Sequence, residues 1–204
     1  MRRSRREGVG MNERVKREIK EWVDALSVAA VLAIVLMTFI LQAFKIPSGS
    51  MIPTFEVGDR IFVDKFLYSA RIPFISLRLP IPSLKQPKRG DIIVFVSPDD
   101  PRKDFVKRLI AVGGETVQIR DGRIYIDGKA VESPSSIRSV YYYNGGVYGK
   151  EGSGVKVPQD CYYALGDNSA NSRDSRFWGF VPKKNLIGKV MFRYWPLYRM
   201  KVIR

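Results

Sequence analysis

The chain has 204 residues, which suffices for one modest domain plus an anchoring segment. Its formal net charge is +15, and eight of its Lys and Arg residues lie within the first twenty positions. The chain contains no histidine, which excludes Ser-His-Asp and Cys-His catalysis and removes the commonest metal ligand. The single cysteine excludes an intrachain disulfide. We expect neither a metal site nor a cofactor.

An uncharged apolar run occupies residues 25–44 (ALSVAAVLAIVLMTFILQAF). About twenty such residues can cross the hydrocarbon core of a bilayer as a helix, and Trp22 suits the membrane interface ahead of them. A buried helix of a soluble protein and a cleaved secretory signal are the alternatives. A secretory h-region is shorter and ends at a small-residue cleavage site, whereas this run passes into Lys45 and Pro47. The sequence therefore predicts a single transmembrane helix at residues 22–44.

The basic segment at residues 1–21 precedes this run directly. Clustered Lys and Arg can bind nucleic acid, but beside a membrane span they keep a segment on the cytoplasmic side. We favour the second interpretation. It predicts a cytoplasmic tail, places everything after Phe44 on the extracytoplasmic side of a membrane, and makes the lipid bilayer, not nucleic acid, a partner. The remaining basic residues could contact anionic lipid.

Residues 45–204 alternate short apolar stretches with Gly, Pro and Asp, which is typical of an all-β domain. We expect a mainly β fold with an antiparallel-sheet domain behind the single N-terminal helix. Its core would comprise residues 45–120 and 160–204, with residues 121–159 as a small β-rich insertion. Expected strands lie at 60–66, 92–96, 104–112, 162–165 and 188–195, and two Asp-Gly pairs predict a hairpin at 121–128.

A proline-rich apolar stretch lies at residues 72–84. Because prolines cannot donate to a ladder, so many of them do not suit a packed sheet. The stretch is either an exposed loop at the lipid interface or a segment whose aromatic residue packs into the core, and the sequence does not decide between them.

A Ser-Gly-Ser turn between two prolines (IPSGSMIPT, residues 46–54) follows the apolar run. Pro47 is expected to end the helix, so Ser50 would lie on a short rigid connection, although a simple polar turn is the alternative. A nucleophilic serine needs a base, and without histidine a lysine with a lowered pKa is the remaining candidate. Lys107 stands among bulky apolar neighbours, but it could also be an ordinary outward-facing lysine.

Four blocks of the sequence occur in order: PSGSMxPT from Pro47, RGDIxVF from Arg89, Lys107-Arg108, and GDNxxxSxDSR from Gly166. Together with the N-terminal anchor they resemble the bacterial type I signal peptidases (leader peptidases). The resemblance covers roughly residues 20–204, less the insertion. It implies a membrane-anchored serine endopeptidase with a Ser/Lys dyad that acts through an acyl-enzyme. Its substrates would be exported preproteins with small residues at the cleavage site.

Roles for individual residues follow from the same resemblance. Ser50 matches the nucleophile and Lys107 the general base, while Ser50 N–H and the Ser48 hydroxyl match the donors of the oxyanion hole. Ser172 matches the hydroxyl that orients the lysine. Asp174 and Arg176 match a supporting ion pair, and the walls of the substrate cleft are matched by Phe44, Ile46, Pro47, Val94, Asp104 and Val106.

One position departs from the family pattern, because this chain has Ser169 where the family often has Arg. Two other functions compete with general signal-peptide removal. One is a specialised peptidase of the same family with a dedicated secretion substrate. The other is an anchored, non-catalytic β-domain that binds peptides.

Overall fold

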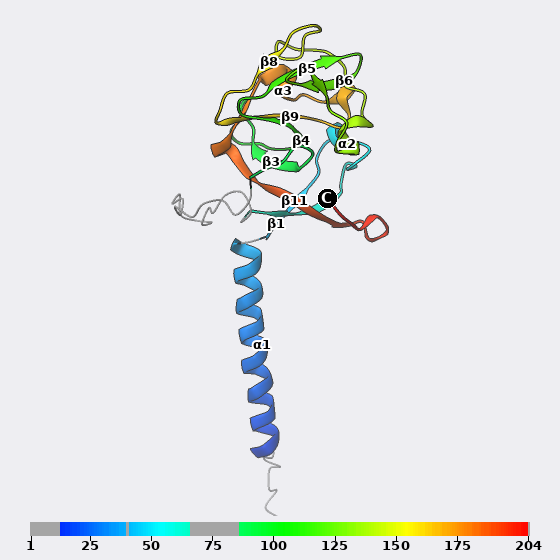
Figure 1. The fold of residues 1–204 in the computed structure, drawn as a ribbon. Helices are drawn as coiled ribbons and strands as arrows, with labels where there is room; N and C mark the ends of the chain where they lie inside the picture. Colours follow the sequence, from blue (N-terminus) through cyan, green and yellow to red (C-terminus); the bar gives the residue numbers. More distant parts are fainter. Residues whose placement is uncertain (1–12, 40, 66–85, 204) are drawn as a thin grey trace, which may run out of the picture. The chain divides into compact units, whose positions relative to one another are not determined.

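The computed structural model describes residues 13–39, 41–65 and 86–203 (Figure 1). The chain divides into two compact units, Met1–Thr38 and Phe39–Arg204. The proline-rich stretch 72–84, for which the sequence left two interpretations open, lies outside the described residues.

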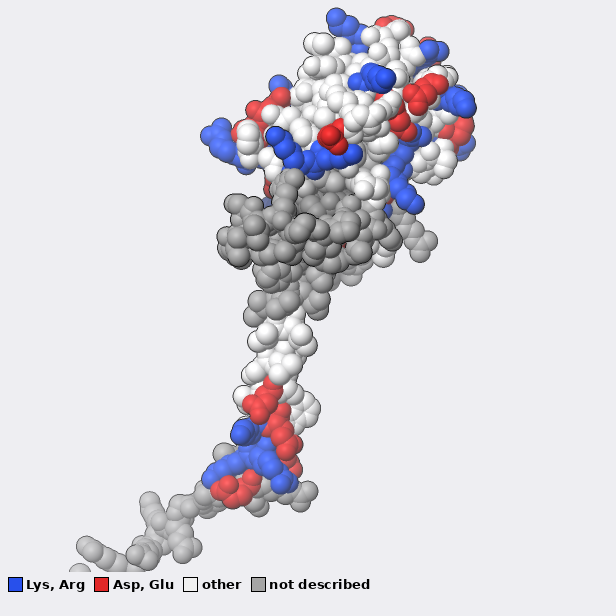
Figure 2. Space-filling view, turned by 60° about the vertical axis from the view of Figure 1, so that its left-hand side comes forward, with Lys and Arg blue, Asp and Glu red and all other residues white. Residues whose placement is uncertain are grey.

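Helix α1, Glu13–Phe39, is the described element of the first unit. Its charged residues gather in the N-terminal turns and an uncharged stretch follows, as the coloured and white parts of the helix in Figure 2 show. Apolar side chains in this stretch are exposed, Leu26 by 64% and Leu32 by 58%. Within the described residues, no helix combines the length and the apolar character needed to cross a membrane.

The predicted helix boundary at residue 44 is wrong, because α1 ends at Phe39 and Leu41–Lys45 form strand β1. β1 pairs antiparallel with β2 (Arg60–Asp64), which places Phe44 opposite Ile61. Pro47 therefore follows a strand and does not end a helix. An apolar run alone cannot distinguish these two structures, and here pairing with β2 supplies the backbone hydrogen bonds that a longer helix would have made.

The main sheet of the second unit has the order β1-β2-β11-β3-β4-β9-β10, with β12 paired to β11. Every pairing described in it is antiparallel, so the predicted mainly antiparallel β-domain is confirmed. The strands beyond β2 are β3 (Ile92–Val96), β4 (Asp104–Val112), β9 (Cys161–Leu165), β10 (Val181–Pro182), β11 (Leu186–Trp195) and β12 (Lys201–Val202).

A second, smaller sheet has the order β7-β6-β5-β8. Its strands are β5 (Thr116–Arg120), β6 (Arg123–Ile126), β7 (Lys129–Ala130) and β8 (Val155–Lys156). It therefore starts at Thr116, before the expected insertion boundary at residue 121. The expected hairpin turn is present between β5 and β6, where Asp121 (φ 48°) and Gly122 (φ 73°) both adopt the left-handed conformation that such turns require.

Three apolar clusters hold these sheets together. One is shared by both sheets, since Ile110 and Leu165 of the main sheet pack with Val117 of the smaller one. A second lies beneath the Ser-Gly-Ser turn and contains Ile46 and Met51, which are 2% and 1% exposed. Burying each such side chain stabilises the fold by about 1.5–3 kcal/mol. The turn is therefore anchored to the core on both sides of Ser50.

Short helices connect several of the strands. They are α2 (Ser135–Arg138), α3 (Ser175–Trp178), η1 (Gly49–Met51), η2 (Ser169–Asn171), η3 (Lys183–Asn185) and η4 (Leu197–Arg199).

Candidate active site

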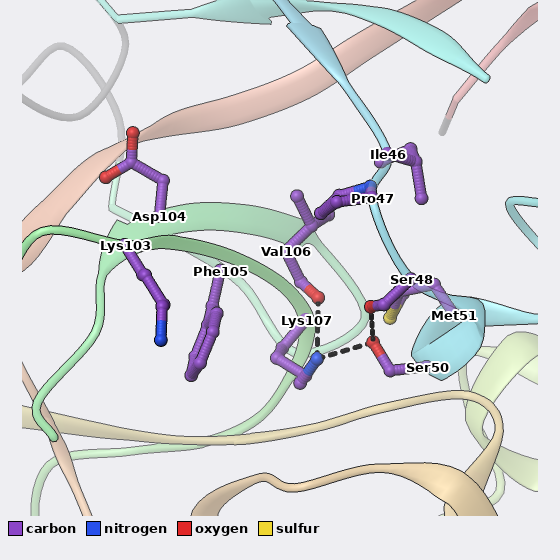
Figure 3. Close-up of a pocket in the computed structure, with 10 residues that line it drawn as sticks. All are labelled: Ile46, Pro47, Ser48, Ser50, Met51, Lys103, Asp104, Phe105, Val106 and Lys107. Atoms are coloured by element: carbon purple, nitrogen blue, oxygen red, sulfur yellow. Dashed lines mark hydrogen bonds between the residues drawn. The ribbon is translucent and has the colours of Figure 1, made fainter. Parts of the chain in front are cut away.

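Ser50 and Lys107 lie together although 57 positions separate them in the sequence. Ser50 stands in η1 and Lys107 in the middle of β4. The Lys107 Nζ atom donates hydrogen bonds to Ser50 Oγ at 2.6 Å and to the carbonyl oxygen of Val106 at 3.2 Å (Figure 3). A nucleophilic hydroxyl and its base must be within such reach of one another for the proton to pass between them.

Burial controls the protonation of Lys107. The side chain is only 4% exposed, and its Nζ lies 5.4 Å from the centre of the Phe105 ring. Desolvation lowers the pKa of Lys107 to about 8, against an upward contribution from the charges of Asp174 and Asp167. With this pKa about a tenth of the amine is uncharged at pH 7 and able to accept a proton, far more than for a lysine at its ordinary pKa of 10.5.

The backbone of η1 is held by Asn168. Its side-chain Nδ2 donates to the Gly49 carbonyl at 3.0 Å, and its main-chain N–H donates to the Ser50 carbonyl at 3.0 Å. The N–H of Ile52 also donates to the Gly49 carbonyl, at 3.2 Å. Because a peptide unit is planar and trans, fixing the Gly49 carbonyl directs the Ser50 N–H to the opposite side. Ser48 Oγ lies 3.4 Å from Ser50 Oγ, so a second donor is close to the nucleophile.

Ser172 is buried, and among the described residues its hydroxyl has no hydrogen-bond partner. The contact with Lys107 that the family resemblance implies is therefore not formed in this structure, where the Lys107 amine bonds to Ser50 and Val106 instead. A Cβ atom at Gly166 would lie 2.3 Å from Ser172 Oγ and 2.5 Å from the Ser50 carbonyl oxygen. Glycine at position 166 thus allows Ser172 and η1 to lie against the same backbone.

Asp174 and Arg176 form a buried bidentate ion pair, with Nε–Oδ1 and Nη2–Oδ2 distances of 2.8 and 2.9 Å. Asp174 also accepts from the Gly166 N–H at 3.1 Å. The Arg176 guanidinium donates to the Ser172 and Ser169 carbonyls at 3.2 and 2.7 Å. The pair therefore holds the 166–176 loop in place. Among the described residues, it makes no hydrogen bond to the Ser50 hydroxyl.

A cleft of about 340 Å³ opens at Ser50 and Lys107, between residues 46–51 and residues 103–107 (Figure 3). Four of the six residues predicted as its walls line it: Ile46, Pro47, Asp104 and Val106. Val94 does not, because both faces of central strand β3 are covered and this side chain is fully buried. Phe44 packs against the same cluster and is also absent from the lining.

One edge of β4 is open beside this cleft. β3 pairs with the whole stretch from Asp104 to Arg108, whereas β9 pairs with β4 only from Arg108 onward. Among the described residues, no strand pairs with the second edge of residues 104–107. The backbone groups there are available to an extended peptide, as in complexes where a ligand adds a strand to a sheet.

A family model described as "Signal peptidase, peptidase S26" matches residues 19–195. The chain belongs to this family. A signal peptidase I from Leptolyngbya laminosa is 39% identical over 190 residues, which cover 89% of this chain and 82% of that protein. A signal peptidase I from Bacillus licheniformis is 33% identical over 189 residues, which cover 91% and 94%. A crystal structure of a signal peptidase I from Enterococcus faecalis V583 aligns with a TM-score of 0.44 and 32% identity, covering 52% of this chain and 97% of that one.

This signal peptidase is thus a serine endopeptidase that removes signal peptides from exported preproteins. In the described part of the chain, no group of three or more Cys, Asp or Glu side chains could hold a metal ion.

Two further buried ion pairs of the signal peptidase were not predicted from the sequence. Arg108 and Asp167 are 3% and 5% exposed, and two hydrogen bonds of 2.8 and 2.6 Å join them. Thr54 Oγ1 donates to the same carboxylate, which ties the end of the Ser50 turn to the 166–176 loop. Arg193 similarly donates to buried Asp59 at 3.1 Å. Arg108 and Asp167 lie within the sequence blocks that resemble the family. This location is the sequence signal that could have identified them as residues near the site.

Proposed function

We propose that this signal peptidase cleaves preproteins with Ser50 as nucleophile and Lys107 as general base. The observation that carries the proposal is the 2.6 Å hydrogen bond between the buried Lys107 amine and Ser50 Oγ. A lysine can act as a base near neutral pH only when its environment disfavours the ammonium form, and burial with a pKa of about 8 supports this.

The proposed reaction proceeds in two steps. Ser50 Oγ attacks the scissile carbonyl carbon while Lys107 takes its proton, and the Ser50 N–H and the Ser48 hydroxyl stabilise the oxyanion. Lys107 then gives the proton to the leaving amine, the C–N bond breaks, and an acyl-enzyme remains. A water molecule, deprotonated by Lys107, hydrolyses that ester and regenerates Ser50. The Ser172 hydroxyl, which has no hydrogen-bond partner among the described residues, is the proposed group that orients the Lys107 amine when that amine leaves Ser50.

The substrate segment ahead of the cleavage site is proposed to lie extended in the 340 Å³ cleft. The open edge of residues 104–107 supports this, because main-chain hydrogen bonds would bind any sequence in that conformation. Successive side chains of an extended chain point to opposite sides, so every second residue would face the apolar walls at Ile46 and Val106. Shallow walls of this kind favour small side chains such as Ala.

We further propose that the apolar run that includes the C-terminal part of α1 anchors the enzyme in the inner membrane. The basic residues ahead of the run favour a cytoplasmic N-terminus, which would place the β-domain on the extracytoplasmic face. The signal helix of a preprotein lies in the same bilayer. Sharing one membrane would raise the effective concentration of the substrate at the cleft.

The test is cleavage of a preprotein with a small-x-small site by the full chain in detergent. Ser50→Ala and Lys107→Met should each lower the rate by at least about 1000-fold, because each removes a group that takes part in the bond-making step. Lys156→Met, at an exposed lysine of β8, is the matched control and should leave the rate unchanged. Retained cleavage by Lys107→Met would disprove the mechanism, and a panel of unrelated preproteins would distinguish a general from a specialised enzyme.

A further inference from the structure

A second groove, of about 470 Å³, adjoins the Ser50 turn. Along the Ser50 turn, Met51 is the last residue that lines the first cleft. The next residue, Ile52, lines the second groove. Across from Ile52 the groove is bounded by Tyr141 and Tyr143 and by Asn168 of the 166–176 loop. Its volume is within the range of pockets that bind ligands.

Ser50 lies between the two hollows. Its Oγ, in contact with Lys107, lines the first cleft. Its carbonyl oxygen accepts the N–H of Asn168, a residue that lines the second groove. A polypeptide whose scissile bond lies at Ser50 Oγ and which continues past η1 would therefore reach this groove next.

The tyrosine wall of the groove is held firmly despite its exposure. The Tyr141 ring lies directly against Gly122, where an added Cβ would come within 2.2 Å of the ring. Tyr143 packs edge-on to Tyr141 with ring centroids 4.9 Å apart. Its N–H donates to Ser169 Oγ at 2.9 Å, and its carbonyl accepts from Arg176 at 2.6 Å. Ser169, the position at which the chain departs from its family's pattern, thus fixes this wall to the loop behind the active site.

We propose that this groove binds the segment of the preprotein directly downstream of the scissile bond, which becomes the N-terminus of the mature protein. The proposal rests on the proposed Ser50–Lys107 function. A cleaved polypeptide extends on both sides of Ser50, and the first cleft, with its open strand edge, accounts for the upstream side only. The groove supplies the space that the downstream side needs.

The lining of the groove also indicates how that segment is bound. The groove is formed by turns and by residues of α2 and η2, so within the described residues it offers no strand edge for main-chain pairing. Its charged member, Asp167, is already paired with Arg108. Contact therefore falls to the exposed tyrosines and Ile52, which favour apolar or aromatic side chains over acidic ones and tolerate many sequences.

The first experiment compares two substrates of the full-length enzyme in detergent. Both carry the same residues up to the cleavage site, but one ends directly after the first downstream residue and the other continues for six. Tyr143→Ala should lower kcat/KM for the long substrate about tenfold and leave the short one nearly unchanged. The matched control is Tyr198→Ala, at a tyrosine that is 85% exposed outside both hollows, and it should change neither. An equal loss on both substrates, or none on either, would overturn the proposal.

A charge exchange provides a second readout that a folding defect cannot imitate. Ser139 is exposed and lines the groove. Ser139→Glu should favour long substrates with Lys at downstream positions over those with Glu by about two- to fivefold, and Ser139→Lys should reverse this preference. The same charges placed upstream of the cleavage site should have no such effect. A preference that follows the upstream charges would assign the groove to the other side and refute the proposal.

These outcomes are separate from the failure of the proposed dyad. If the dyad is wrong, Lys107→Met will cleave both the short and the long substrate. If only the groove assignment is wrong, Lys107→Met will be inactive, while the groove variants will treat all substrates as the unsubstituted enzyme does.

Discussion

Two opposing effects act on the Lys107 amine. Its burial disfavours the ammonium form, while the negative charges of Asp174 and Asp167 favour it. Desolvation is the larger effect, and the resulting pKa of about 8 lies below the ordinary lysine value of 10.5. Both carboxylates are themselves engaged by arginines, Asp174 by Arg176 and Asp167 by Arg108. We infer that these arginines help keep Lys107 deprotonated by limiting the field of the carboxylates at the amine.

This balance predicts the pH dependence of the enzyme. Only the uncharged amine can accept the Ser50 proton, so kcat/KM should rise about tenfold per pH unit well below pH 8 and level off above about pH 8. A short peptide substrate assayed from pH 6 to 10 in one detergent would measure this. A midpoint near 10.5, the value of an unperturbed lysine, would contradict the role given to burial.

At the scale of elements, the site depends on how the 166–176 loop holds η1. Asn168 bonds both the Gly49 and Ser50 carbonyls, Thr54 bonds Asp167, and Gly166 lies against the Ser50 carbonyl. Hydrogen bonds from the loop thus determine the direction of the Ser50 N–H, the proposed oxyanion donor.

Asn168→Ala tests this arrangement. It removes the Nδ2 donor to Gly49 but keeps the main-chain bond to Ser50, so we expect kcat to fall about 10- to 100-fold with little change in KM. Asn185→Ala is a matched control, because the Asn185 side chain also donates to a main-chain carbonyl, that of Val96 at 3.0 Å, far from η1 in sequence. Equal losses of kcat in the two variants would reduce the role of Asn168 to general stability.

The elements also show how far the sequence could lead. β4 spans residues 104–112 and β3 residues 92–96, both with the bounds predicted from apolar runs between turn residues. β1 was missed because its apolar residues continue those of α1 without a break. The strand forms because it pairs with β2, and the local sequence does not reveal that partner.

For the site, residue type alone left both Ser50 and Lys107 open to ordinary interpretations, and the family resemblance supplied their roles. The sequence block that contains Asp167 and Asn168 did not indicate a role for either residue. Asn168 acts through hydrogen bonds to main-chain carbonyls, and because every residue type has such a carbonyl, the sequence does not identify its partners. That Val94 does not line the cleft was not foreseen either, since the two faces of a wholly apolar strand such as β3 cannot be told apart from the sequence.

The whole molecule consists of two units, and the apolar cluster beneath the proposed nucleophile Ser50 belongs to residues 39–204. A truncated chain containing only these residues should therefore fold and cleave a short soluble peptide at nearly the rate of the full chain. It should lose most of its rate on preproteins embedded in vesicles, because the proposed anchor is missing. The ratio of the two rates measures the effect, and an unchanged ratio would contradict a role for the first unit in anchoring.

Among the described residues, no strand pairs with the second edge of β4 at residues 104–107, and this has a cost outside catalysis. An unpaired strand edge can dock onto the same edge of another copy, which is a common start of aggregation. Lys103 and Asp104 line the cleft at the start of this edge, and charged side chains at a strand edge discourage such self-association. Neutralising both should make concentrated, substrate-free enzyme prone to precipitate, and a bound peptide that covers the edge should keep it in solution.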